Sequence, residues 1–185
     1  SAIGLIGGDK YDPRPLSKPG YFVLEDNVAV EFNIPPASKV DDFVASISWV
    51  LDELKAEVAQ HKLSLCVSAA ELFPPSQLRH PRSQIFGCDP DYNAWNKGEV
   101  NPKPKATAVT LRAAGGHIHF GYPEREDPRF RLRLIQTCDL FLGVPSVVMD
   151  TNLRRRELYG KAGSFRETSY GCEYRTLSNF WLRSR

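Results

Sequence analysis

The sequence predicts an α+β protein with a largely antiparallel, curved sheet and helices packed on one side of it. Two observations lead to this expectation. Short segments of alternating apolar and polar residues recur along the chain, and helical periodicity lies between them without a regular strand–helix–strand rhythm. In addition, the chain contains no G-x-G-x-x-G and no G-x-x-x-x-G-K-[S/T] loop, which argues against a Rossmann domain and a P-loop.

The composition is that of an ordinary globular protein, and length predicts one domain over residues 1–185. The formal net charge of +2 gives no electrostatic reason to expect a nucleic-acid partner. No apolar run is judged long enough to span a bilayer, so we expect no membrane contact. The cysteines form no C-x-x-C pair, and we expect reduced thiols and a cytoplasmic location.

The first alternating segments, Tyr21–Leu24 and Val28–Asn33, predict two strands joined by an Asp-Asn turn. In the second strand, Glu31 should lie on the face opposite the large apolar side chains. We then expect a helix from Val40 to Gln60, capped by Ser38, because apolar residues recur at helical spacing.

The segment "KLSLCVSAAELF" predicts a buried strand, and the Pro- and Gly-rich region Pro74–Lys105 predicts a long loop. From its position alone, the part of this loop around Asp89, Tyr92 and Trp95 is our candidate for selecting an acceptor substrate.

The stretch "AAGGHIHFGY" places two histidines on alternate residues between glycines. In a strand, which we expect over Thr107–Tyr122, His117 and His119 would share one face while Ile118 and Phe120 face a core. Such a face can hold a metal or a phosphate-bearing ligand. The alternative is a pair of histidines on the wet face of an ordinary strand.

A helix should follow, with Asp127 as its N-cap and Pro128 in its first turn, and we expect it to end at Gly143 and Pro145. A short helical stretch is expected near Thr151–Leu158. Its basic residues Arg155 and Arg156 are interpreted as a solvated helix end.

The end of the chain, "SYGCEYRTLSNFW", alternates again, so Glu173 and Arg175 should share one face. Carboxylates on separate strands, together with the histidines, are typical ligands of Mg²⁺ or Mn²⁺. In "YGKAGSFRE", Lys161 and Arg166 lie beside two glycines, which is a pattern suited to binding phosphate or carboxylate.

The segments "EDNVAVEFNIPP", "AGGHIHFGY" and "YGKAGSFRETSYGCEYRTLSNFW" occur in that order. Together they resemble the phage-type COOH–NH2 ligases (amidoligase type 2) of the glutamine synthetase and glutamate–cysteine ligase superfamily. The likeness extends from Gly7 to Trp181. It implies a glutamine synthetase-like catalytic domain and an ATP-dependent enzyme that phosphorylates a carboxylate and lets an amine attack the acyl phosphate, forming an amide.

The resemblance also implies roles for particular residues. It implies ATP and Mg²⁺ (or Mn²⁺) as cofactors, with metal ligands at Glu25, Glu31, His117 and Glu173. It implies catalytic arginines at Arg166 and Arg175. The residues expected to bind ATP or substrate are His119, Arg154, Lys161 and Asn33.

Family members carry a further strand ahead of "IGGDK", and we expect this strand to be missing or to be supplied by a complementing segment or another subunit. The expected substrates are a small-molecule or peptide carboxylate and an amine, and a homo-oligomer is compatible with the superfamily. The expected location is the host cytoplasm if the chain is phage-encoded.

Two alternatives stay open. The first is a catalytically inactive or incomplete binding or structural module that keeps the amidoligase fold. The second is a metal-dependent hydrolase or oxygenase that uses H-x-H with one carboxylate, but this leaves the terminal arginines unexplained.

Overall fold

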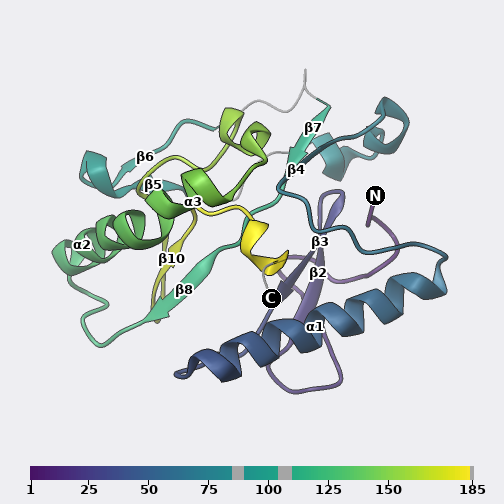
Figure 1. Cartoon of the computed structure of the whole chain (residues 1–185), viewed down its shortest axis with the longest axis horizontal. Coiled ribbons are helices and arrows are strands. Elements are labelled where there is room, and N and C mark those ends of the chain that lie inside the picture. Colours follow the sequence, from purple (N-terminus) through teal and green to yellow (C-terminus); the bar gives the residue numbers. More distant parts are fainter. Residues whose placement is uncertain (85–89, 104–109, 184–185) are drawn as a thin grey trace. The chain divides into compact units, whose positions relative to one another are not determined.

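The structure is a computed structural model that describes residues 1–84, 90–103 and 110–183 (Figure 1). The chain divides into two compact units, and each has its own hydrophobic core. The first unit comprises Ser1–Cys66 and Pro74–Ile85, and the second comprises Val67–Phe73 and Phe86–Arg185. The expectation of a single catalytic domain stays a prediction.

The first unit is a three-stranded antiparallel sheet packed against one long helix. The strands are β1 (Arg14–Pro15), β2 (Phe22–Asp26) and β3 (Ala29–Asn33), and the helix is α1 (Val40–Gln60). Both strands of the predicted hairpin and the helix are confirmed, with small shifts of the strand ends. Asn27 turns the hairpin with a φ of 62°, a left-handed conformation that asparagine tolerates better than most residues. Val23 of the sheet and Val50 and Leu54 of α1 belong to the same buried core.

Two expectations for this part of the chain are wrong. The N-cap of α1 is Lys39 rather than Ser38, and no side chain caps the helix. The predicted strand in "KLSLCVSAAELF" shrinks to β4 (Ala70–Leu72), and Leu63 is 51% exposed. The reason is that this stretch carries the chain from the first unit to the second at Cys66 and Val67, so most of it has no partner strand.

The second unit is built on a five-stranded antiparallel sheet with the order β6-β5-β9-β10-β8. A separate two-stranded ladder joins β4 to β7. Every strand pair in the described ranges is antiparallel, which confirms the α+β class, although the described strands form three separate sheets rather than one. The strands are β5 (Tyr92–Asn93), β6 (Glu99–Val100), β7 (Leu111–Ala113), β8 (Ile118–Gly121), β9 (Ser164–Thr168) and β10 (Gly171–Tyr174).

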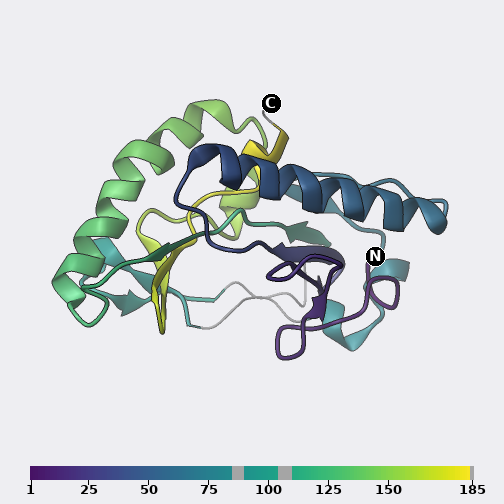
Figure 2. The ribbon, with the colours of Figure 1, turned by 90° about the horizontal axis from the view of Figure 1, so that it is seen from below.

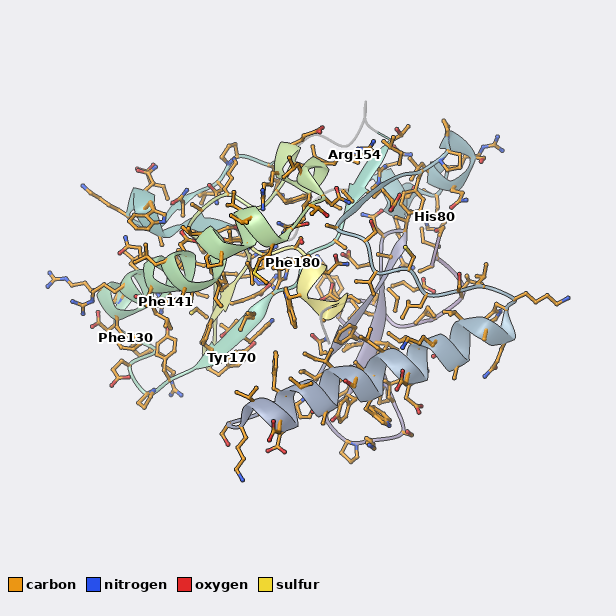
Figure 3. All side chains as sticks on the ribbon, viewed as in Figure 1. His80, Phe130, Phe141, Arg154, Tyr170 and Phe180 are labelled. Atoms are coloured by element: carbon orange, nitrogen blue, oxygen red, sulfur yellow. The ribbon has the colours of Figure 1, made fainter. Side chains whose placement is uncertain are left out.

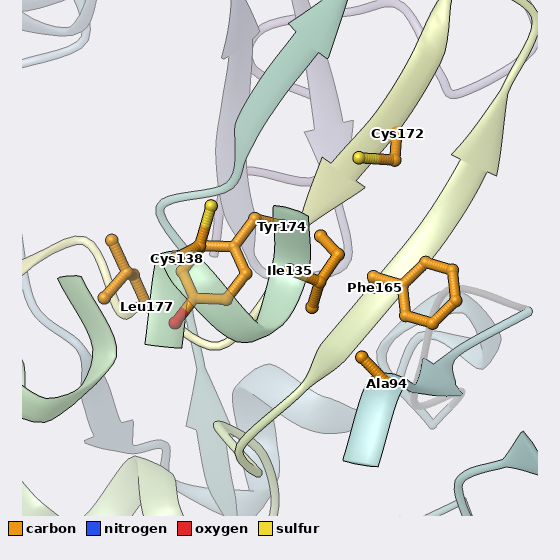
Figure 4. Packing of buried hydrophobic residues seen from close by; sticks show 7 residues of the cluster. All are labelled: Ala94, Ile135, Cys138, Phe165, Cys172, Tyr174 and Leu177. Carbon is orange, nitrogen blue, oxygen red and sulfur yellow. The ribbon is translucent and has the colours of Figure 1, made fainter. Parts of the chain in front are cut away.

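One face of this sheet forms the core of the second unit against α2 (Pro128–Cys138), as Figure 4 shows. Cys172 and Tyr174 alternate on β10 and are fully buried, and they pack with Ile135 of α2. Asp127 caps α2 by accepting a hydrogen bond from the Arg129 N–H at 2.8 Å, as predicted. The opposite face of the sheet is therefore left for the polar residues of the same strands.

The helix after Asp127 does not end at Gly143 and Pro145, as was expected. It continues through a π-helical turn, η4 (Asp139–Gly143), into α3 (Val144–Met149). Gly143 instead permits close packing, because a Cβ there would lie 2.6 Å from the Tyr174 hydroxyl. Pro145 lies in the first turn of α3, where its missing N–H costs little.

This continuous helical stretch bears on the expectation of no membrane contact. Pro128–Met149 is the one helix in the described ranges that is long and apolar enough, by length and composition, to cross a membrane. The core helix of a folded domain passes the same test, and Ile135 and Cys138 of this stretch lie in the core. The expectation that no apolar run is long enough is thus wrong, and the absence of membrane contact stays a prediction.

Short 3₁₀-helices complete the fold and are visible from below in Figure 2. The predicted short helical stretch near Thr151–Leu158 is one of them. They are η1 (Pro75–Leu78), η2 (Pro81–Gln84), η3 (Ala94–Asn96), η5 (Leu153–Glu157) and η6 (Phe180–Arg183).

The histidine strand is broken by its glycine pair. β7 ends at Ala113, β8 begins at Ile118, and between them Gly115 bridges to Ser178 while the Gly116 N–H donates to the Leu177 carbonyl at 3.1 Å. A Cβ on Gly116 would lie 2.5 Å from the Ser178 carbonyl oxygen. The glycine is therefore required by the close approach of two backbone segments.

We expect Gly116→Ala to lower the free energy of unfolding by about 1–3 kcal/mol, because the new methyl group collides with backbone rather than with a flexible side chain. Gly121→Ala is the matched control, since its Cβ would lie 3.7 Å from the nearest atom, an ordinary contact. Urea titration of both variants measures the difference. Equal stability of the two variants would contradict this packing.

Candidate functional site

The polar face of the five-stranded sheet carries most of the residues that the sequence singled out. Glu173 of β10 pairs directly with His119 of β8 and with Arg166 of β9, so these three side chains share one face. His117 directly precedes β8 and Arg175 directly follows β10, and both side chains lie on the same face because both approach the Glu173 carboxylate. The predicted shared faces of the two histidines and of Glu173 with Arg175 are confirmed.

The centre of this face is the Glu173 carboxylate, which is 1% exposed. One oxygen, Oε1, lies 2.7 Å from Nδ1 of His117. The other, Oε2, accepts hydrogen bonds from Arg166, at 2.8 Å from Nε and 2.5 Å from Nη2. Nη1 of Arg175 lies 3.9 Å from Oε1. We call these four residues the Glu173 cluster.

The cluster keeps Glu173 ionised despite its burial. Burial by itself would raise the pKa of Glu173, but the hydrogen bond from His117 and the charges of Arg175 and Arg166 outweigh it and lower the pKa to about 2. Burial lowers the pKa of His117, against the opposing effect of Glu173. At neutral pH a neutral imidazole therefore donates its Nδ1–H to the carboxylate.

A second carboxylate, Asp91, supports the cluster from the position directly before β5. Asp91 Oδ1 lies 3.6 Å from Nε of Arg175 and accepts a hydrogen bond from Ser164, while Oδ2 accepts one from Asn101 at 3.0 Å. The sequence interpretation did not assign Asp91 to the site. The sequence signal for Asp91 was its position next to Tyr92. In an extended segment, Asp91 points to the face opposite the Tyr92 ring, which is the polar face.

His119 lies beside the cluster and contacts the turn between β9 and β10. Its Nδ1 hydrogen-bonds the hydroxyl of Tyr170, whose side chain is labelled in Figure 3. Burial lowers the pKa of His119. Tyr170 was also missed, because a tyrosine in a hairpin turn gives no sequence signal for a site.

The structure does not join the other basic candidates to the cluster. Arg154 and Lys161 are exposed, and no ion pair or hydrogen bond within the described ranges links their side chains to Glu173. Their expected roles in binding ATP or substrate stay predictions.

Three predicted residues, Glu25, Glu31 and Asn33, belong to the first unit. Glu25 is buried and accepts hydrogen bonds from the N–H groups of Ile6 (3.2 Å) and Gly7 (3.0 Å). Burial would raise the pKa of Glu25, but the backbone donors and a guanidinium beside it lower the pKa overall. That guanidinium belongs to Arg82, whose Nη1 lies 3.2 Å from Oε2.

The two strand glutamates of the first unit do not face the same way. Glu25 pairs with Val30, whereas Glu31 pairs with Leu24, so the register places the glutamates on opposite faces of the hairpin. Glu31 and Asn33 are exposed on one of those faces. One ion therefore cannot take both carboxylates from this hairpin.

The Glu173 cluster by itself does not fit a divalent cation. No group of three or more His, Cys, Asp or Glu side chains converges within residues 1–84, 90–103 and 110–183. A cation at Glu173 would also face two guanidinium groups. The donors suit an anion instead, because Arg166 is one-third exposed and Nη1 of Arg175 is buried without a hydrogen-bond partner.

Part of the proposed acceptor loop can be placed. Asp89 lies outside the described residues. Trp95 is half-exposed and its indole N–H donates to Asp139 at 2.5 Å, and Tyr92 packs toward the core beside Phe165. Neither ring lies in the polar cluster, and the role of this loop stays a prediction.

The sequence profile of one protein family matches the chain over residues 92–185, which is just over half of its length. The chain belongs to the phage phiEco32-like COOH–NH2 ligase type 2 family. The match lies entirely within the second unit and includes every residue of the Glu173 cluster. It does not extend to Gly7, as the resemblance suggested, and so it leaves Glu25, Glu31 and Asn33 unmatched.

No curated protein and no solved structure matches the chain significantly. The family name identifies a ligase that joins carboxyl and amino groups.

We expect Glu173→Gln to lower the free energy of unfolding at pH 7 by about 3–5 kcal/mol, because the buried cations lose their counter-charge. Since the folded pKa of about 2 is below the ordinary glutamate pKa of 4.5, the carboxylate stabilises the fold above pH 4.5. This contribution disappears as the pH falls from 4.5 towards 2, so the wild type and the variant should converge there.

Chemical denaturation of both proteins across this pH range measures the effect. Glu126→Gln is the control, since that side chain is 94% exposed, and we expect a change within about 0.5 kcal/mol. A difference between wild type and Glu173→Gln that does not change with pH would contradict the proposed charge state.

Proposed function

We propose that this chain is an ATP-dependent ligase that joins a carboxylate to an amine through an acyl phosphate. The observation that supports this most directly is the Glu173 cluster inside the family-matched residues. Two guanidinium groups face the polar side of the sheet and retain donors that Glu173 does not use. Planar guanidinium groups bind carboxylate and phosphate oxygens well.

The proposed reaction has two steps. A substrate carboxylate oxygen attacks the γ-phosphorus of ATP, and ADP leaves, which gives an acyl phosphate. The amine nitrogen then attacks the acyl carbon, phosphate leaves, and the nitrogen loses a proton. Both steps develop negative charge on oxygen, and we propose that Arg166 and Arg175 stabilise it.

In this proposal Glu173 is a positioning residue. Its two oxygens hold Arg166 and His117 in fixed places, and Arg175 lies within 3.9 Å. Because the carboxylate offsets part of their charge, the site would bind an oxyanion and still release it after turnover.

We further propose Mg²⁺ or Mn²⁺ as the metal, with His119, Arg154 and Lys161 binding ATP or substrate. Mg²⁺ commonly uses only one or two carboxylates together with substrate phosphates and water. Because the Glu173 cluster alone does not fit such an ion, the ligands of the metal ion must come largely from ATP, water or other residues. Glu25, Glu31 and Asn33 remain candidates without support from the family match.

The proposed substrates are a small-molecule or peptide carboxylate and an amine, in the cytoplasm. A binding module without turnover is the second candidate. The ion pairing of Glu173 favours it, because a carboxylate already paired with guanidinium groups is a poor metal ligand.

Calorimetric titration of ATP, with and without MgCl₂, tests the proposal. We expect metal-dependent binding that weakens about tenfold or more in Arg166→Gln, since a charge-assisted hydrogen bond is lost. Arg133→Gln, a change of the same charge on the exposed side of α2, should bind as the wild type does.

Binding should be followed by ADP release when acids and amines are screened together. Magnesium-dependent binding without ADP release from any pair would favour the binding module. Absence of ATP binding under every metal condition would contradict the proposal.

A further inference from the structure

Arg155 was expected at a solvated helix end. That expectation is wrong, since Arg155 is 4% exposed. Its Nη1 donates to the Thr176 carbonyl at 2.8 Å, and its Nη2 donates to the Arg175 carbonyl at 3.2 Å. Arg155 thus holds the backbone that directly follows β10.

The positive charge of Arg155 is offset only from a distance. Within the described ranges no ion pair to Arg155 is found, and its Nε is buried without a hydrogen-bond partner. Burial lowers its pKa to about 10, although the charge of Asp150 acts in the opposite direction. A buried charge without a direct ion pair is costly, so such a group is a candidate for binding an anion.

A cavity of about 240 Å³ lies beside this guanidinium, and every residue that lines it belongs to the second unit. Thr176, one of the lining residues, hydrogen-bonds the same Asp139 oxygen that accepts from the Tyr174 hydroxyl of the core. The cavity therefore lies on the helix side of the sheet, opposite the Glu173 cluster.

The hydrogen-bond donors around the cavity, rather than its formal charge, favour an anion. Two aspartates line it together with the two arginines, so the formal charges balance, but both carboxylates already accept hydrogen bonds: Asp150 from Ser178 at 2.7 Å and Asp139 from Tyr174 at 2.7 Å. Nη2 of Arg156 donates to the Ser146 carbonyl at 2.9 Å. With the unpartnered Nε of Arg155, the remaining donors belong mainly to the two arginines.

We propose that this cavity is a second binding site, which takes a small oxyanion, either inorganic phosphate or a small carboxylate, between Arg155 and Arg156. The volume is below that of typical cofactor pockets and is too small for a nucleotide. Because Arg155 also binds the carbonyls of Arg175 and Thr176, an anion here would stabilise the strand end that presents Arg175 to the opposite face.

The test uses the full chain and needs no ATP or turnover. Inorganic phosphate and acetate are titrated separately, by calorimetry and by thermal unfolding, against sodium chloride at the same ionic strength. We expect saturable binding of at least one oxyanion, weakened about tenfold or more in Arg156→Gln and unchanged in Arg133→Gln.

Arg166→Gln separates the two sites. Binding that survives Arg166→Gln and is weakened by Arg156→Gln supports the proposal, and the anion that saturates shows whether phosphate or carboxylate is preferred. If Arg156→Gln does not fold, Arg156→Lys, which keeps the charge but loses the planar fork, should weaken binding severalfold. No saturable binding, or binding that only Arg166→Gln removes, would overturn the proposal.

Discussion

The second unit depends on one buried carboxylate and the donors arranged around it. Glu173 is nearly inaccessible to solvent, yet His117 and Arg166 keep it ionised. His117 directly precedes β8, whereas Arg166 lies in β9. The pairing of β8, β9 and β10 is thus fixed by electrostatics on one face as well as by apolar packing on the other. Either contribution alone would leave the polar face less well defined.

The two proposed anion sites place their arginines on opposite sides of the same strand end. Arg175 extends toward Glu173 while its carbonyl accepts from Arg155. The backbone of Arg175 is therefore held by the Arg155 guanidinium on one side of the sheet, while the Arg175 side chain lies on the other side. Binding at either site would restrict the same short segment, which gives a physical route by which occupancy of one could influence the other.

Patterns that depend on neighbours in the sequence were predicted well. Alternation placed His117 with His119, and Glu173 with Arg175, correctly on shared faces, and periodicity gave α1 within its observed ends. What failed depends on distant contacts. Arg155 is buried because its guanidinium binds carbonyls about twenty residues away. Glycine is required at position 143 because the Tyr174 hydroxyl lies too close for a side chain, and not because a helix ends there. Asp91 joins the site only through pairing of β5 with β9.

The alternation in β10 has a consequence for how this strand can change over time. Cys172 and Tyr174 fill the core, and Glu173 between them anchors the polar cluster. Inserting or deleting one residue would exchange the two faces and bury charge where apolar groups belong. A substitution in β10 changes one side chain on one face, whereas a change in the length of the strand would disrupt the core and the polar cluster together. The length of β10 is therefore a stricter constraint than the identity of most of its residues.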